Sequence, residues 1–260
     1  MHLVRATEIE AMRQFSRSRG LAAGGAFVLG AALLAGEASA QSGGAADWNG
    51  FYVGAEAGWT FSAFDDDWRF TNANYFNTLG ATIVGNDFGF SPDGFIGGGL
   101  AGYNRQSGNW VFGAEVGIDG TLYEDKKPSP FFPAIDTFKT EVDWIATVAG
   151  RLGYSAGGWL AYAKAGYAGG DVELRLVDIP SAIIATLDGW ANGYVAGAGL
   201  EYALTDRIVF GVGYSHVGLF IDDRGMNCGT CGVGVGFGTP DVSGDINIDK
   251  VAARLTVRLR

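Results

Sequence analysis

Residues 48–61 alternate between two kinds of side chain, as expected for a β-strand whose successive residues point to opposite faces. One face of this strand is apolar, with aromatic residues at its ends and small residues in the middle: Phe51, Val53, Ala55, Ala57, Trp59 and Phe61. The other face carries Glu56. Glu56 itself lies at mid-strand, where the core of a soluble sandwich would require an apolar side chain. An apolar outer face with aromatic ends and a polar inner face is typical of a membrane β-barrel strand.

The same alternation recurs in later segments, and the connections between them alternate in length. Strands are predicted at residues 94–106, 109–123, 138–155, 158–170, 189–204, 207–221 and 244–260. Tight turns are predicted at 107–108, 156–157 and 205–206, and long polar connections at 62–93, 124–137, 171–188 and 222–243. We therefore predict an all-β fold, an eight-stranded antiparallel transmembrane up-and-down β-barrel. In the weakest strand, 94–106, a register through Ile96 and Leu100 is an alternative to one through Gly97, Gly99, Ala101 and Tyr103.

Charged side chains fall on the inner face of the predicted strands. A cation such as Arg151 or Lys164 facing lipid would cost up to about 2–4 kcal/mol, and several would rival a domain's stability of about 5–15 kcal/mol. We therefore predict an inward charge network of Glu56, Glu115, Asp119, Asp143, Arg151, Lys164, Glu201, Arg254 and Arg258. The first and last strands of a closed barrel are neighbours, so Glu56 should share this network with Arg254 or Arg258.

The interior of an eight-stranded barrel is just wide enough for side chains to fill. Buried charges must be paired, so the network is expected to plug the barrel. A narrow passive porin for small polar solutes is the alternative function. A soluble periplasmic barrel with an apolar ligand would need apolar residues inside, which the inward carboxylates oppose.

The first forty residues have the pattern of a cleaved export signal. Arg13, Arg17 and Arg19 precede an apolar run at 21–36, and Ala38-Ser39-Ala40 forms a small-x-small cleavage site. Residues 1–40 are thus predicted to be a Sec signal peptide, 41–47 a short lead-in and 48–260 the barrel domain. The formal net charge of −10 opposes binding to nucleic acid.

No segment predicts catalysis, a metal or a cofactor. Gly97-x-Gly99-x-x-Gly102 matches a dinucleotide fingerprint, but it lies inside a strand and not between a strand and a helix. Ser215 and His216 are adjacent on a strand, so they point to opposite faces and cannot form a catalytic pair. The acidic run at 65–67 is predicted to be a solvated loop.

Two cysteines, Cys228 and Cys231, lie in the last long connection. A redox CxxC motif opens a helix, and no helix is predicted here. In an exported protein we therefore predict a small loop disulfide, with a loop metal site as the alternative.

Four motifs together resemble a known family: WNGFYVGAEAGW, GFIGGGLAGYN with NWVFGAE, AGRLGY and GAGLEYALTD. They resemble the RopB-like outer-membrane proteins of alphaproteobacteria, OmpA-type eight-stranded barrels also called porin-family proteins. The resemblance spans nearly all of 48–260. It implies an outer-membrane location and a structural or surface role in the cell envelope. Because an even number of strands returns the chain to its starting side, the termini and the three short turns are expected to be periplasmic and the long connections to face outward. The expected partners are outer-membrane lipid, lipopolysaccharide and the barrel-assembly machinery, with any ligand of the outer loops unknown.

Overall fold

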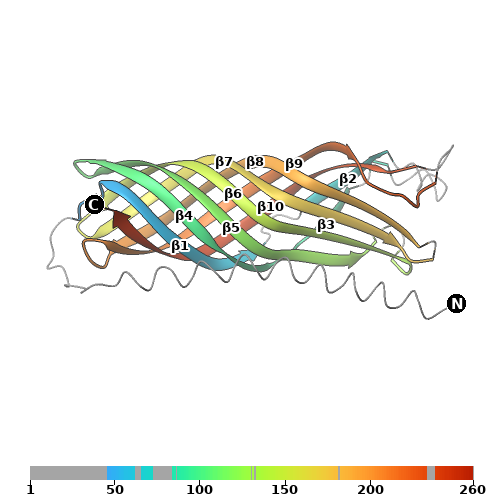
Figure 1. Cartoon of the computed structure of the whole chain (residues 1–260), viewed down its shortest axis with the longest axis horizontal. Coiled ribbons are helices and arrows are strands. Elements are labelled where there is room, and N and C mark those ends of the chain that lie inside the picture. The colour runs from blue at the N-terminus through green and yellow to red at the C-terminus, as the bar shows by residue number, and fades with distance from the viewer. Residues whose placement is uncertain are drawn as a thin grey trace.

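The computed structural model describes residues 46–61, 66–72, 84–85, 87–129, 131, 133–180, 182–232 and 238–259. The predicted signal peptide lies outside these residues. Eight antiparallel strands close into a ring in which β1 pairs with β10, as Figure 1 shows, and the predicted fold class is confirmed. The ring consists of β1 (Gly50–Phe61), β4 (Gly94–Ser107), β5 (Trp110–Pro128), β6 (Asp136–Ala156), β7 (Trp159–Asp178), β8 (Ile183–Ala203), β9 (Ile208–Gly225) and β10 (Asp241–Leu259).

The two ends of the barrel differ. At one end, here called the turn end, short turns join β4 to β5, β6 to β7 and β8 to β9. Gly108 and Gly157 have φ angles of 58° and 60° in the first two of these turns, a conformation that glycine adopts without steric cost. The longer connections lie at the opposite end, here called the loop end (Figure 1).

The segment predicted as the first long loop contains two further strands. β2 (Asp66–Asn72) pairs with residues 241–245 of β10, and β3 (Asp87–Phe90) pairs with β2. Their inward side chains, Trp68, Phe70, Phe88 and Phe90, are at most 5% exposed and pack in the apolar interior of the loop end. The prediction that Asp66 belongs to a solvated loop is wrong. Its buried carboxylate accepts hydrogen bonds from the Tyr123 hydroxyl at 3.2 Å and the Asn247 amide at 2.8 Å.

The strands extend further toward the loop end than predicted. The prediction ended them too early because the polarity of the two faces of each strand inverts at that point. On β7 the outward positions are apolar up to Tyr167 and then become Asp171, Glu173 and Arg175, while the inward positions become Val172, Leu174 and Leu176. An alternation with the opposite polarity therefore continues the same strand. Residues 171–178 and 183–188, predicted as loop, are strand for this reason.

An aromatic band marks the level at which the outer surface changes polarity. It consists of Trp144, Tyr167, Trp190 and Tyr194. The Trp144 and Trp190 ring centroids lie 4.9 Å apart, and Trp190 Nε1 donates to the Tyr167 hydroxyl at 3.1 Å. Below the band, β4 presents Phe95 and Tyr103 outward and buries Ile96 and Leu100, so its predicted outer face is the one through Gly97, Gly99 and Ala101. Among the described residues, no helix is long and apolar enough to cross a membrane.

Candidate functional site in the barrel interior

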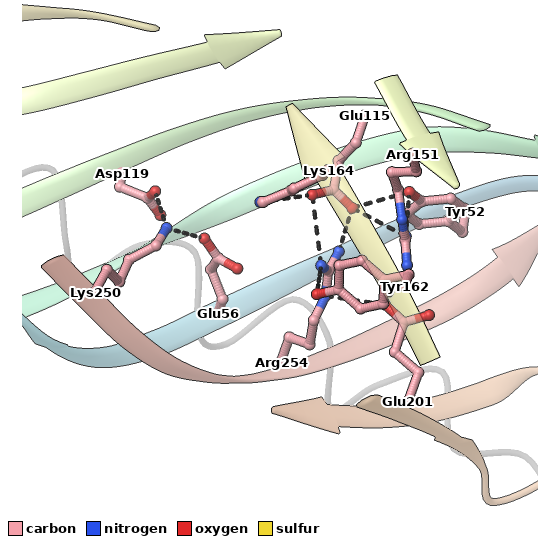
Figure 2. A network of polar contacts seen from close by, with 10 residues as sticks. All are labelled: Tyr52, Glu56, Glu115, Asp119, Arg151, Tyr162, Lys164, Glu201, Lys250 and Arg254. Carbon is pink, nitrogen blue, oxygen red and sulfur yellow. Dashed lines mark hydrogen bonds and ion pairs between the residues drawn. The ribbon is translucent and has the colours of Figure 1, made fainter. Parts of the chain in front are cut away.

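The charged residues of the interior gather in one layer, near the middle of the strands below the aromatic band. They come from inward positions on six strands of the ring: Glu56 on β1, Glu115 and Asp119 on β5, Arg151 on β6, Lys164 on β7, Glu201 on β8, and Lys250 and Arg254 on β10. Figure 2 shows that their side chains point toward one another in two groups.

The larger group is centred on Glu115, whose side chain is 4% exposed. Its carboxylate lies 3.1 Å from Arg151 Nη1 and 3.1 Å from Lys164 Nζ, and it also pairs with Arg254. Glu201 lies on the other side of both arginines, 2.8 Å from Arg151 Nη2 and 3.5 Å from Arg254 Nε. Three cations therefore share two carboxylates.

Two tyrosines complete this group. The Tyr52 hydroxyl donates to Glu115 Oε2 at 2.9 Å and accepts from Arg151 at 2.7 Å. The Tyr162 hydroxyl accepts from Arg254 Nη1 at 2.9 Å, and its ring centroid lies 4.0 Å from the Arg151 guanidinium carbon. The tyrosines were not among the predicted site residues. Their positions on the inward face of β1 and β7 could have identified them as neighbours of the charged side chains.

The smaller group places Lys250 between two carboxylates. Lys250 Nζ lies 2.7 Å from Asp119 Oδ2 and pairs with Glu56 (Figure 2). Glu56 shares the charged layer with Arg254 as predicted, but its direct ion-pair partner is Lys250 and neither Arg254 nor Arg258. Arg254 does lie opposite Glu56 in the strand register, but its guanidinium reaches Glu115 instead. Because this group has one cation for two carboxylates, the two groups balance each other in charge.

Two predicted members lie outside the layer. Asp143 is exposed, because an irregularity between Val142 and Trp144 shifts the register and turns Asp143 to the outer surface beside Glu141. Arg258 faces inward but lies at the turn end. There it donates to the Thr205 carbonyl at 3.0 Å and to the Asp47 carbonyl, with its guanidinium 5.2 Å from the Trp48 ring centroid.

Apolar side chains lie on both sides of the charged layer. Toward the turn end, Trp48 packs with Ala46, Val111, Leu160, Ala203 and Val209. Toward the loop end, a much larger cluster includes Trp68, Phe70, Phe138, Leu174, Leu219 and Ile246. The inward glycines of β9 make room for neighbours, since a Cβ on Gly213 would lie 3.0 Å from the Tyr162 hydroxyl and one on Gly211 would lie 3.1 Å from Arg254 Cγ.

A small enclosed space lies between the charged layer and the larger apolar cluster. Its polar lining is Asp119, Thr147, Lys164, Ser215 and Lys250. Asp119 Oδ1 is buried and has no hydrogen-bond partner among the described residues. A polar cavity of this kind generally holds ordered water, so we expect water to hydrate this carboxylate.

The remaining candidate residues lie away from the charged layer. Cys228 and Cys231 form a disulfide in the connection after β9. His216 points outward and Ser215 inward, as their parity predicted. Sequence reasoning did not find the partners of His216: its Nδ1 lies 3.1 Å from Asp249 Oδ1 and its Nε2 lies 3.2 Å from the Tyr194 hydroxyl.

Two aspartates face each other inside the barrel at the loop end. Asp136 on β6 lies directly opposite Asp178 on β7, and both are buried. Asp136 Oδ1 has no hydrogen-bond partner among the described residues. Burial and the neighbouring Asp178 carboxylate raise the pKa of Asp136 to about 6.

Because the pKa of Asp136 is higher in the folded than in the unfolded protein, its contribution to stability is fully present below about pH 4 and is lost as the pH rises through about 6. Asp136→Asn should therefore stabilise the protein at pH 7.5 more than at pH 4.5, as measured by chemical unfolding in detergent. Asp206→Asn, at an exposed turn, is the control. An equal effect of Asp136→Asn at both pH values would contradict the assignment.

Comparison with known proteins gives consistent relatives. Residues 27–238 match the model of a family described as "Outer membrane protein beta-barrel domain". The 31 kDa outer-membrane immunogenic protein of Brucella melitensis is 33% identical over 171 residues, which cover 62% of this chain and 66%, slightly less than two thirds, of that relative. The 22 kDa outer membrane protein of Rhizobium leguminosarum bv. viciae is 28% identical over 186 residues, which cover 72% of this chain and 71% of that relative. The solved structure of OprG from Pseudomonas aeruginosa has a TM-score of 0.49 and 13% identity, covering 84% of this chain and 98% of that one.

Proposed function

We propose that this chain, which belongs to the family of outer-membrane β-barrel proteins, is a structural and surface-exposed component of the cell envelope whose lumen is closed by its own side chains. Its location in the outer membrane follows from the family and from the named outer-membrane relatives. Insertion by the barrel-assembly machinery and contact with lipopolysaccharide are parts of the same proposal.

The observation that carries the proposal is the layered interior. A charge-balanced layer is held between apolar layers on both sides. An ion entering from either end would have to leave water and cross apolar side chains before it met a charged group, and such desolvation is costly. Around Glu115 the charges are already paired, so they offer a passing ion little compensation.

The absence of catalysis is also part of the proposal. His216, the only histidine beyond the predicted signal peptide, lies on the outer surface between Asp249 and Tyr194, and the serine beside it faces inward. A serine–histidine mechanism needs both side chains on one face. The name of the Brucella relative, an immunogenic outer-membrane protein, is consistent with a surface role for this chain.

Planar-bilayer recording tests the closed lumen. The purified protein, reconstituted at low density, should give no steady conductance steps at moderate voltage and salt. A narrow passive porin is the alternative function that the sequence left open, so the opposite result has a clear meaning. Reproducible unitary steps in the wild-type protein would replace this proposal by that of a narrow pore for small polar solutes.

The orientation in the membrane makes a separate prediction. The turn end should be periplasmic and the loop end should face outward, as in bacterial barrels with short periplasmic turns and long outer loops. Protease added to intact cells should therefore cut near 65–86 or 225–238 and spare the turn at Ser107-Gly108. Opening the outer membrane supplies the control for access to the periplasm. Cleavage at that turn in intact cells, with the long connections protected, would reverse the orientation.

A further inference from the structure

Three buried polar residues lie in one row on neighbouring strands, at the rim of the loop end. Asp136 is the first residue of β6 and Asp178 is the last residue of β7, and the two are direct partners in the strand register. On the other side of Asp136, the amide of Ser129, just after β5, donates to the Asp136 carbonyl at 3.0 Å. Ser129, Asp136 and Asp178 are 0%, 2% and 7% exposed. The row therefore places a hydroxyl and two carboxylates beside one another at the rim.

The charges of this row are not balanced within the protein. Like charges directly opposite each other destabilise a sheet, and a buried carboxylate needs a partner. Asp136 Oδ1 has no hydrogen-bond partner among the described residues. Lys127, a cation on the same face of β5 as Ser129, pairs with Asp125 at 3.2 Å instead. A buried carboxylate oxygen without a partner thus lies next to a second carboxylate, and a positive ligand would complete the arrangement.

The spacing and position of the row suit a calcium ion. Direct partners on neighbouring strands have Cβ atoms about 5 Å apart, so both carboxylates can reach one ion at the Ca–O distance of about 2.3–2.6 Å. Calcium accepts about six to eight oxygen ligands in a flexible geometry. Water can supply the remaining ligands from the rim, because the adjacent residues Ile135 and Ile179 are 40% and 61% exposed. Magnesium requires a nearly ideal octahedron and gives up its water reluctantly, so it fits this pair less well.

We propose that Asp136 and Asp178 bind a calcium ion at the rim of the loop end, with Ser129 beside them as a neutral oxygen donor. The ion joins the start of β6 to the end of β7, because it replaces repulsion between the two carboxylates by attraction to a shared charge. No third Asp, Glu, His or Cys side chain completes a metal site with this pair in the part of the chain that the structure describes. With so few charged ligands, the affinity should be that of extracellular calcium modules, a Kd of about 0.1–1 mM. The site does not depend on whether the lumen conducts.

Urea unfolding of the purified protein in a nonionic detergent at pH 7.5 tests this proposal. In about 10 mM calcium chloride, compared with EDTA at equal ionic strength, the equilibrium constant for folding of the wild type should rise about 10- to 100-fold, as this Kd requires. The test variants are Asp136→Asn and Asp178→Asn, which keep the size of the side chain. The matched control is Asp188→Asn, which removes one exposed carboxylate from another directly opposed acidic pair, Glu173 and Asp188 on β7 and β8.

The effect of Asp136→Asn should change sign with calcium. In EDTA the variant should be more stable than the wild type, because one of two opposed like charges is removed. In calcium it should be less stable, because most of the gain from the ion is lost. Asp178→Asn should also lose most of that gain, and Asp188→Asn should keep it.

Calorimetric titration with calcium chloride measures the binding directly. One site should appear in the wild type and in Asp188→Asn, and none in Asp136→Asn or Asp178→Asn. An equal gain from calcium in the wild type and Asp136→Asn would overturn the proposal. An equal loss of that gain in Asp188→Asn would show only general screening of the acidic loop end and would overturn it as well. Magnesium binding as tight as that of calcium would overturn the assignment to calcium.

Discussion

Glu115→Gln is expected to lower the free energy of unfolding by about 3–5 kcal/mol, the usual cost of removing one partner from a buried ion pair. Glu115 carries the carboxylate that Arg151, Lys164 and Arg254 share, and all four side chains are at most 8% exposed. With a neutral amide at this position, three cations would remain for Glu201 alone in the larger group. The size of the side chain hardly changes, so the effect reports on charge and not on packing.

Equilibrium unfolding by urea in detergent micelles measures this loss. Glu124→Gln is the matched control, because it lies on the same strand, faces outward and has a 57% exposed side chain. Its effect should stay within about 0.5 kcal/mol. Adding Arg254→Met to Glu115→Gln should recover part of the loss, since it removes one uncompensated cation. Equal effects at Glu115 and Glu124 would refute the charged layer.

Trp68→Ala is expected to cost a similar amount, about 3–5 kcal/mol, through the cavity that it leaves. Trp68 is fully buried in the loop-end apolar cluster. Its ring packs so closely against Gly244 of β10 that a Cβ atom on Gly244 would lie 2.7 Å from the nearest ring carbon. The substitution removes the largest side chain that β2 sends into the barrel. We therefore expect β2 and β3 to open more readily than the ring strands.

Limited proteolysis together with urea unfolding measures both effects. Cleavage within 66–90 should accelerate in Trp68→Ala, while the ring strands remain resistant. Asp67→Ala is the control, because Asp67 is the exposed neighbour on the same strand. If Trp68→Ala and Asp67→Ala behave alike, β2 does not contribute to the interior of the barrel.

The parity of side chains along each strand made most of the fold predictable. Once residues 48–61 were assigned an apolar outer face, the same rule assigned Glu115, Arg151, Lys164, Glu201 and Arg254 to the interior. Lys250 has the same parity as Arg254 and lies within the predicted last strand, 244–260, so the same rule places it in the interior although it was not among the predicted members. The disulfide followed from the exported context of two nearby cysteines.

Other features depend on information that parity does not contain. A single irregularity beside Val142 reverses the parity of the β6 positions on its loop-end side, so Val142 is buried and Asp143 lies outward. The partner of Glu56 depends on which long side chain reaches which carboxylate across the lumen, and Arg254 reaches past its neighbour to Glu115. Residues 171–178 and 183–188 were assigned to a loop because their polarity is that of a strand surrounded by water and not by lipid.

The central claim is that one set of strands faces lipid below the aromatic band, water above it, and a closed interior throughout. Spin labels placed singly along β7 test it, with oxygen and a water-soluble nickel complex as collision reagents. Outward positions Ala161, Ala163 and Ala165 should favour oxygen, Glu173 and Arg175 should favour nickel, and inward positions Ala168 and Val172 should be protected from both. Nickel access at Ala168 and Val172 would contradict the closed interior. Nickel access at Ala161, Ala163 and Ala165 would contradict the membrane-spanning wall.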